Sequence, residues 1–147
     1  MPTEVRSTPR ADQQIERLDR RQRRTLDRFL DELAAQGCRA LGYRLTGTAP
    51  MDHICVKHLD STLRVVVAFE TADLAWILLV GPHEDSDPVL DVYTELYRLL
   101  GAAPPDAERR TKPPCCEEPA GSPPALGDAL ADILDRATQV RRTRRTR

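Results

Sequence analysis

Arg64 is the first side chain in the sequence whose type and position suggest chemistry. It stands inside the apolar run 63–69, and side chains in a strand alternate between the two faces. Alternation places Arg64 on the face of Glu70 and opposite Phe69. A guanidinium in mid-strand is costly to bury unless it is paired. Two interpretations stay open: an ion pair with Glu70 or a cross-strand acid, or a bidentate ligand for a phosphate group.

His83 and Tyr93 follow the apolar region and could handle protons or nucleobases. His83 comes directly after Pro82, at the corner that ends the last apolar run. Its imidazole can take or give a proton near neutral pH, although a single loop histidine is more often simply exposed. Tyr93 lies where a helix is expected, so its ring belongs either to the core or to a surface that stacks on bases.

Lys57 and His58 are neighbours in the apolar run 54–59. Adjacent strand residues point to opposite faces of a sheet, so only one of the two can share the face of Arg64. The pairing register between the strands decides which one does, and the sequence does not supply that register.

Short apolar runs separated by turn residues predict the sheet that must position these side chains. Runs rich in Val and Ile and bounded by Asp, Ser and Thr are typical of an antiparallel meander. Four such runs are present: 39–46, 54–59, 63–69 and 75–80. We therefore expect a four-stranded antiparallel sheet over Arg39–Val80.

A helix or a helical hairpin is expected before the sheet. An apolar stripe at helical spacing runs from 15 to 34, after a favourable start at Pro9 and before a glycine at Gly37. Gln22 interrupts the stripe and suggests a break into two helices. Residues 1–6 are expected to be irregular.

The C-terminal part is expected to hold one more helix of the domain and then a loosely attached extension. Asp87 is a candidate N-cap for a helix over 88–100. The expected organisation is one α+β domain, residues 9–101, followed by a Pro-rich extension, residues 102–147, with a short helix over 126–134 and a basic tail. We expect this extension to contribute little to the stability of the domain.

Composition predicts a cytoplasmic protein without a membrane contact. The 147 residues contain no apolar run of about 18 residues and no secretory signal pattern at the N-terminus. The net charge is −1, and the 51–101 region carries three basic and nine acidic residues. Only the basic N-terminal helix and the basic C-terminal tail could contact a polyanion, which is a weak indication of nucleic-acid binding.

The four cysteines show neither a metal-ligand spacing nor a disulfide spacing: Cys38, Cys55, Cys115 and Cys116. The vicinal pair cannot easily form a bridge within itself. We interpret all four as reduced thiols of a cytosolic protein. Metal binding by these cysteines and the histidines is the weaker alternative.

The order of these elements and three short motifs resemble the RelE/ParE superfamily of bacterial toxins. Members have a helical N-terminal part, a basic residue in mid-strand, a last strand that ends in Val-Gly-basic, and a tyrosine beyond it. The matching segments are Leu63-Arg64-Val65-Val66, Val80-Gly81-Pro82-His83 and Asp91-Val92-Tyr93. The resemblance covers about residues 12–100.

The resemblance implies a toxin that cleaves mRNA as a metal-independent endoribonuclease, usually in the ribosomal A site. A ribose 2′-hydroxyl would attack the adjacent phosphate, with one group removing its proton and another protonating the departing 5′-oxygen. The expected partners are a cognate antitoxin protein and mRNA, with the ribosome as an optional partner. No cofactor and no metal are expected.

The resemblance also implies roles for individual residues. Arg64 would stabilise charge on the phosphate, His83 would transfer protons, and Tyr93 would orient a base or a proton. Lys57 and Arg44 would bind RNA. Lys57 is preferred over its neighbour on the face of Arg64 because the second strand of the family often carries lysine.

A non-catalytic protein-binding module with the same fold is the alternative function. Under this interpretation the acidic segment 84–91 is only a solvated loop, and an amphipathic helix grips a protein partner. The two functions differ in one observable feature, namely whether Arg64, His83 and Tyr93 converge on one reachable face.

Overall fold

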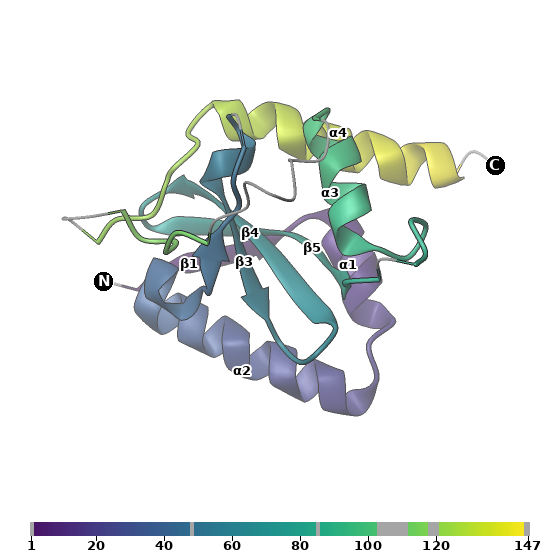
Figure 1. The fold of residues 1–147 in the computed structure, drawn as a ribbon, viewed down its shortest axis with the longest axis horizontal. Coiled ribbons are helices and arrows are strands. Elements are labelled where there is room, and N and C mark those ends of the chain that lie inside the picture. Colours follow the sequence, from purple (N-terminus) through teal and green to yellow (C-terminus); the bar gives the residue numbers. More distant parts are fainter. Residues whose placement is uncertain (1, 48, 85, 103–111, 118–120, 146–147) are drawn as a thin grey trace.

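The computed structural model describes residues 2–47, 49–84, 86–102, 112–117 and 121–145, which form an α+β fold around one mixed sheet (Figure 1). The strand order is β1-β5-β4-β3-β2. The strands are β1 (Glu4–Ser7), β2 (Tyr43–Arg44), β3 (Ile54–His58), β4 (Leu63–Thr71) and β5 (Leu74–Pro82). The four expected antiparallel strands are present as β2 to β5, although β2 is much shorter than the run 39–46.

The fifth strand, β1, corrects the expectation that residues 1–6 are irregular. It lies parallel to β5 at the edge of the sheet, with Val5 opposite Ala75. The Glu4 amide donates to the Asp73 carbonyl at 2.8 Å. Four residues with two charges give no clear strand pattern, because an edge strand is held largely by backbone hydrogen bonds to its neighbour.

The N-terminal helical part is a hairpin of α1 (Pro9–Glu16) and α2 (Arg20–Gln36). Thr8 caps α1 by accepting from the Ala11 amide at 3.0 Å. The break between the helices comes before Gln22, because Asp19 is the N-cap of α2. Gln22 lies in the first turn of α2, where its side chain accepts from the Asp19 amide and completes the capping box.

The helix α3 (Val92–Leu100) begins four residues later than expected. Its N-cap is Asp91 and not Asp87, since the Asp91 carboxylate accepts from the Thr94 amide at 3.1 Å. Asp87 instead caps a turn by accepting from the Val89 amide at 3.0 Å. Val89 therefore lies in the turn before the helix and is 86% exposed.

The second helix beyond the sheet, α4 (Ala129–Arg145), is longer than the expected 126–134 and lies next to α3 (Figure 1). Leu130, Ile133 and Ala137 are buried with α3 and the sheet in one apolar cluster. The Leu126 amide also donates to the Phe69 carbonyl at 2.8 Å. The expectation of a loosely attached extension is therefore wrong, because α4 packs buried apolar side chains into the core that α3 and the sheet share.

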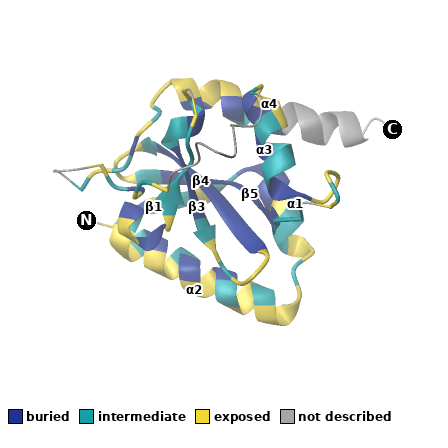
Figure 2. Ribbon diagram, in the orientation of Figure 1, coloured by how far each residue is buried: buried dark blue, intermediate teal, exposed yellow. Residues whose placement is uncertain are grey.

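Two apolar cores lie on the two faces of the sheet (Figure 2). Phe69 belongs to the core under α2, with Leu26, Phe29 and Leu33. Val66 and Ala68, which alternate with Phe69, belong to the core under α3 and α4. The placement of Arg64 opposite Phe69 is confirmed, but helices cover both faces and not only the face of Phe69.

Two disulfides join the extension to the domain, so the interpretation of four reduced thiols is wrong. Cys116 bonds to Cys38 in the short 3-10 helix after α2, and Cys115 bonds to Cys55 in β3. The corresponding Cα–Cα separations are 5.3 and 5.7 Å. Cys115 and Cys116 do not bond to each other, and each forms a disulfide with a different cysteine of the domain. The spacing of the cysteines along the sequence does not reveal this pairing.

Candidate functional site

The candidate site lies at one end of the sheet, on the face that carries α3. Arg64 stands directly between His58 on β3 and Gly81 on β5. Residues directly opposite in an antiparallel pair share a face, so His58 is the neighbour of Arg64. Lys57 is opposite Val65 and lies on the other face. The preference for Lys57 beside Arg64 is therefore wrong, and Lys57 is not part of the site described below.

Arg64 is buried, and no described carboxylate forms an ion pair with it. Its side chain is 7% exposed, and one terminal nitrogen donates to the Asp60 carbonyl at 3.1 Å. Its Nε has no hydrogen-bond partner among the described residues. Glu70, the expected alternative partner, accepts from the Trp76 indole at 3.2 Å. The ion pair with Glu70 is therefore excluded, and the guanidinium is held by carbonyl groups of the turn before β4, since its second terminal nitrogen donates to the Ser61 carbonyl at 3.4 Å.

Two tyrosines and a histidine form a hydrogen-bonded chain beside Arg64. The Tyr43 hydroxyl lies 3.0 Å from His58 Nε2 and 3.2 Å from the Tyr93 hydroxyl. The ring of His83 meets the ring of Tyr93 edge-on, with 4.9 Å between centroids. The structure thus brings Arg64, Tyr93 and His83 together, and it adds Tyr43 and His58, which the sequence analysis did not assign to the site.

Asp91 orients His83. His83 Nδ1 lies 3.1 Å from Asp91 Oδ1, and the same oxygen accepts from the Glu84 amide at 3.0 Å. Burial raises the pKa of Asp91, but hydrogen bonds from Glu84, His83 and Thr94 outweigh it and hold the pKa below its ordinary value. An ionised carboxylate can only accept, so Nδ1 carries the proton of the neutral imidazole. Nε2 is then the basic nitrogen of His83.

The hydroxyl of Tyr93 is held in its protonated form. Burial raises its pKa far above the ordinary value, and the hydrogen bond with Tyr43 adds to the rise, while the nearby Arg64 opposes it. At neutral pH Tyr93 is therefore a hydrogen-bond donor and not an anion. A donor beside a buried guanidinium and an oriented imidazole can serve an anionic group that changes its charge during a reaction.

We expect the pKa of His58 to lie below the ordinary histidine value. Burial lowers it first, and the charges of Arg64 and Lys112 lower it further. Replacing Lys112 by Met should raise the pKa of His58 part of the way back, because burial remains. Histidine NMR titration of the wild type and of Lys112→Met measures this directly. A His58 pKa at or above its ordinary value, or one that Lys112→Met leaves unchanged, would contradict this electrostatic description.

Arg44, expected to bind RNA, is placed away from this cluster. It is opposite Cys55, on the other face of β3 from His58. Its Nε donates to the Pro114 carbonyl at 3.0 Å, and its guanidinium lies 3.8 Å from Glu117. Arg44 therefore anchors the extension, and an RNA-binding role for it stays a prediction.

Two general features bear on ligands and location. Among the described residues, no three His, Cys, Asp or Glu side chains gather into a possible metal site. Within the same part of the chain, no helix is both long and apolar enough to cross a membrane.

Solved structures of bacterial toxins resemble this chain. One is the toxin–antitoxin complex RelBE2 from Mycobacterium tuberculosis, with a TM-score of 0.48, 20% identity, and coverage of 56% of this chain and 99% of that chain. Another is a YoeB/ParE toxin from Agrobacterium tumefaciens, with a TM-score of 0.48, 15% identity, and coverage of 56% of this chain and all of that chain (100%). No family model matches the sequence, and no curated protein matches it.

Proposed function

We propose that this protein is the toxin of a toxin–antitoxin pair and that it cleaves mRNA as a metal-independent endoribonuclease. The observation that carries this proposal is the meeting of Arg64, His83 and Tyr93 at one end of the sheet, where His83 contacts Tyr93 and the charge of Arg64 acts on the Tyr93 hydroxyl. The proposal of an antitoxin partner rests on the sequence resemblance. The mRNA substrate would place the protein in the cytoplasm.

In the proposed reaction, His83 starts the cleavage. Its Nε2 removes the proton from a ribose 2′-hydroxyl, and the oxygen forms a bond to the adjacent phosphorus. Asp91 holds the ring and stabilises the imidazolium that results. Two negatively charged equatorial oxygens develop on phosphorus, and the guanidinium of Arg64 stabilises them.

The same step breaks the bond from phosphorus to the 5′-oxygen of the next nucleotide. The departing oxygen is strongly basic and takes a proton from the Tyr93 hydroxyl. After cleavage His83 releases its extra proton to water, and Tyr93 regains a proton from water through the hydroxyl of Tyr43, which is hydrogen-bonded to His58. The products are a 2′,3′-cyclic phosphate on the upstream fragment and a free 5′-hydroxyl on the downstream fragment.

A protein-binding module without catalysis is the second candidate. Val89 and Leu90 favour it, since they are 86% and 58% exposed in the loop before α3. Exposed large apolar side chains commonly mark a protein contact. The same pair is also compatible with an active toxin, because it would then be part of the surface that an antitoxin covers.

Regulated expression in a bacterial host tests the proposed function. Induction of the wild type should stop growth and shorten bulk transcripts, whereas Arg64→Ala should do neither at equal protein level. Co-expression of the open reading frame next to the gene should restore growth. Normal growth and intact transcripts after induction of soluble wild-type protein would contradict the proposal and favour the binding module.

A further inference from the structure

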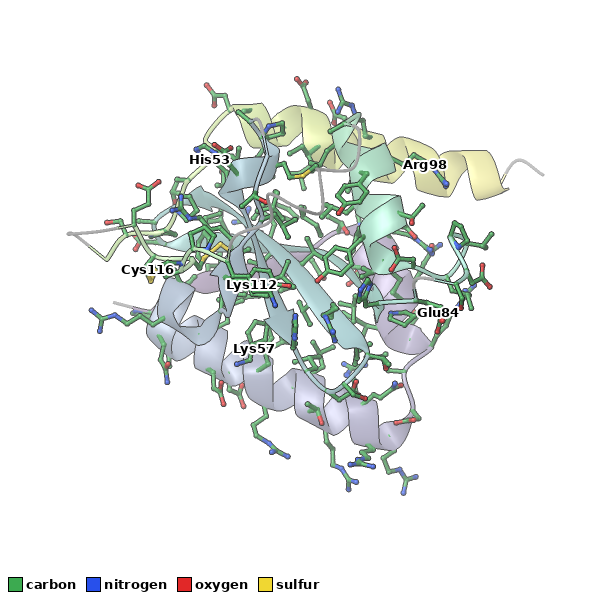
Figure 3. The ribbon with its side chains drawn as sticks, viewed as in Figure 1. His53, Lys57, Glu84, Arg98, Lys112 and Cys116 are labelled. Carbon is green, nitrogen blue, oxygen red and sulfur yellow. A yellow bond between two sulfur atoms is a disulfide. The ribbon has the colours of Figure 1, made fainter. Side chains whose placement is uncertain are left out.

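A cation from the C-terminal extension reaches the candidate site. The Lys112 ammonium lies over the ring of Tyr43, 5.2 Å from its centroid. The hydroxyl of the same ring contacts both His58 and Tyr93. In the view of Figure 3, Lys112 lies between the labelled Cys116 and Glu84. Lys112 therefore belongs to the same surface as the residues assigned above.

The segment that carries Lys112 is held in place by covalent and polar contacts. The Arg44 amide donates to the Pro113 carbonyl at 2.8 Å, and the Arg44 Nε donates to Pro114. Directly after these residues, Cys115 and Cys116 are each bonded to the domain through a disulfide. Only two residues, Pro113 and Pro114, separate Lys112 from its first covalent anchor at Cys115, so its backbone is fixed although its side chain is exposed.

Two cations lie near the histidine that the Tyr43 hydroxyl contacts. The charges of Arg64 and Lys112 both act on His58 and lower its pKa. Among the described residues, no carboxylate forms an ion pair with Arg64 or Lys112. Two cations that approach the same tyrosine–histidine chain without an acid between them repel each other, and a bound anion would relieve this repulsion.

We propose that Lys112 is a second phosphate-binding residue of the site and grips the RNA backbone next to the phosphate held by Arg64. This inference rests on the proposed function. A lysine suits this role because its ammonium is a point charge on a flexible stem and can follow a backbone phosphate without fixed geometry. The extension is then part of the substrate surface and not only a brace for the core.

Binding of a fluorescent single-stranded oligoribonucleotide of mixed sequence, with 2′-O-methyl riboses to prevent cleavage, tests the inference. Lys112→Ala should weaken binding severalfold at low salt. The slope of log K against log salt should fall by about 0.7, the contribution of one phosphate contact on a single strand. Lys112→Arg should restore the slope. Arg28→Ala removes an exposed positive charge from α2, on the other side of the sheet, and should change neither quantity.

Three outcomes separate this inference from the proposed function. Binding by the wild type with a reduced slope in Lys112→Ala alone supports the inference. Binding by the wild type with the same affinity and slope in Lys112→Ala overturns the role of Lys112 and leaves the proposed function standing. Absence of any binding by the wild type, free or with ribosomes, overturns both.

Discussion

Leu130→Ala is expected to lower the free energy of unfolding by about 2–5 kcal/mol. Leu130 is fully buried in α4 and packs in the core that α3 and the sheet share. Its truncation removes apolar contact and leaves a cavity that the surrounding side chains fill only in part. Equilibrium unfolding in urea, followed by circular dichroism, measures the loss.

Val89→Ala is the matched control for this experiment. Val89 is 86% exposed, so the same kind of truncation should change the free energy of unfolding by no more than about 0.5 kcal/mol. Equal stability of Leu130→Ala and Val89→Ala would show that α4 does not complete the core. A protein truncated after Gly101 that unfolds cooperatively at the wild-type temperature would show the same.

Arg64→Ala and His83→Ala are each expected to reduce RNA cleavage by about a hundredfold or more, the usual loss when an electrostatic group of a transition state is removed. Arg64 stabilises negative charge that develops on the phosphate oxygens during the reaction, and His83 takes a proton in the same step. Each substitution should therefore lower the rate constant of cleavage more than the affinity for RNA. Single-turnover cleavage of a labelled RNA gives the rate.

Arg64→Lys separates the chemistry from the fold. It keeps the charge but lacks the planar fork that grips two phosphate oxygens, so it should recover only part of the activity. Arg28→Ala should cleave at the wild-type rate, since Arg28 lies on α2 across the sheet. Wild-type cleavage by Arg64→Ala or His83→Ala would remove that residue from the proposed mechanism.

The central sheet could be predicted because its strands carry their own signal. Successive side chains of the run 63–69 point to alternate faces of the sheet, so the position of Arg64 in the run already placed it on the face opposite Phe69. The register could not be predicted, because a shift by one residue exchanges Lys57 and His58 between faces and both residue types suit an RNA-binding protein. Only the pairing of β3 with β4 decides between them.

The elements outside the meander were predicted less well because tertiary contacts, and not local patterns, define them. Glu4–Ser7 becomes a strand through β5, and Ala129–Arg145 becomes part of the core by packing on α3. The start of α3 was misplaced because Asp87 and Asp91 are equally good caps in the sequence. The disulfides join residues 60 and 78 positions apart, and no local pattern carries that information.

For the candidate site, the residues with unusual chemistry could be identified singly, but their relations could not. Arg64, His83 and Tyr93 each had a common structural explanation in the sequence. Tyr43 gave no signal beyond its place in a short strand, although its hydroxyl links His58 to Tyr93. A hydrogen-bonded chain across three elements becomes visible only when the fold brings those elements together.

Cleavage through the 2′-hydroxyl can be tested with the purified wild type in the presence of a chelator. The substrates are an end-labelled RNA and a copy of it that has a single 2′-deoxyribose at the main cleavage position. We expect cleavage of the RNA to leave a 2′,3′-cyclic phosphate, and we expect the copy to resist at that position because the attacking oxygen is missing. Cleavage of both at equal rates, or of neither when free or bound to ribosomes, would contradict the account.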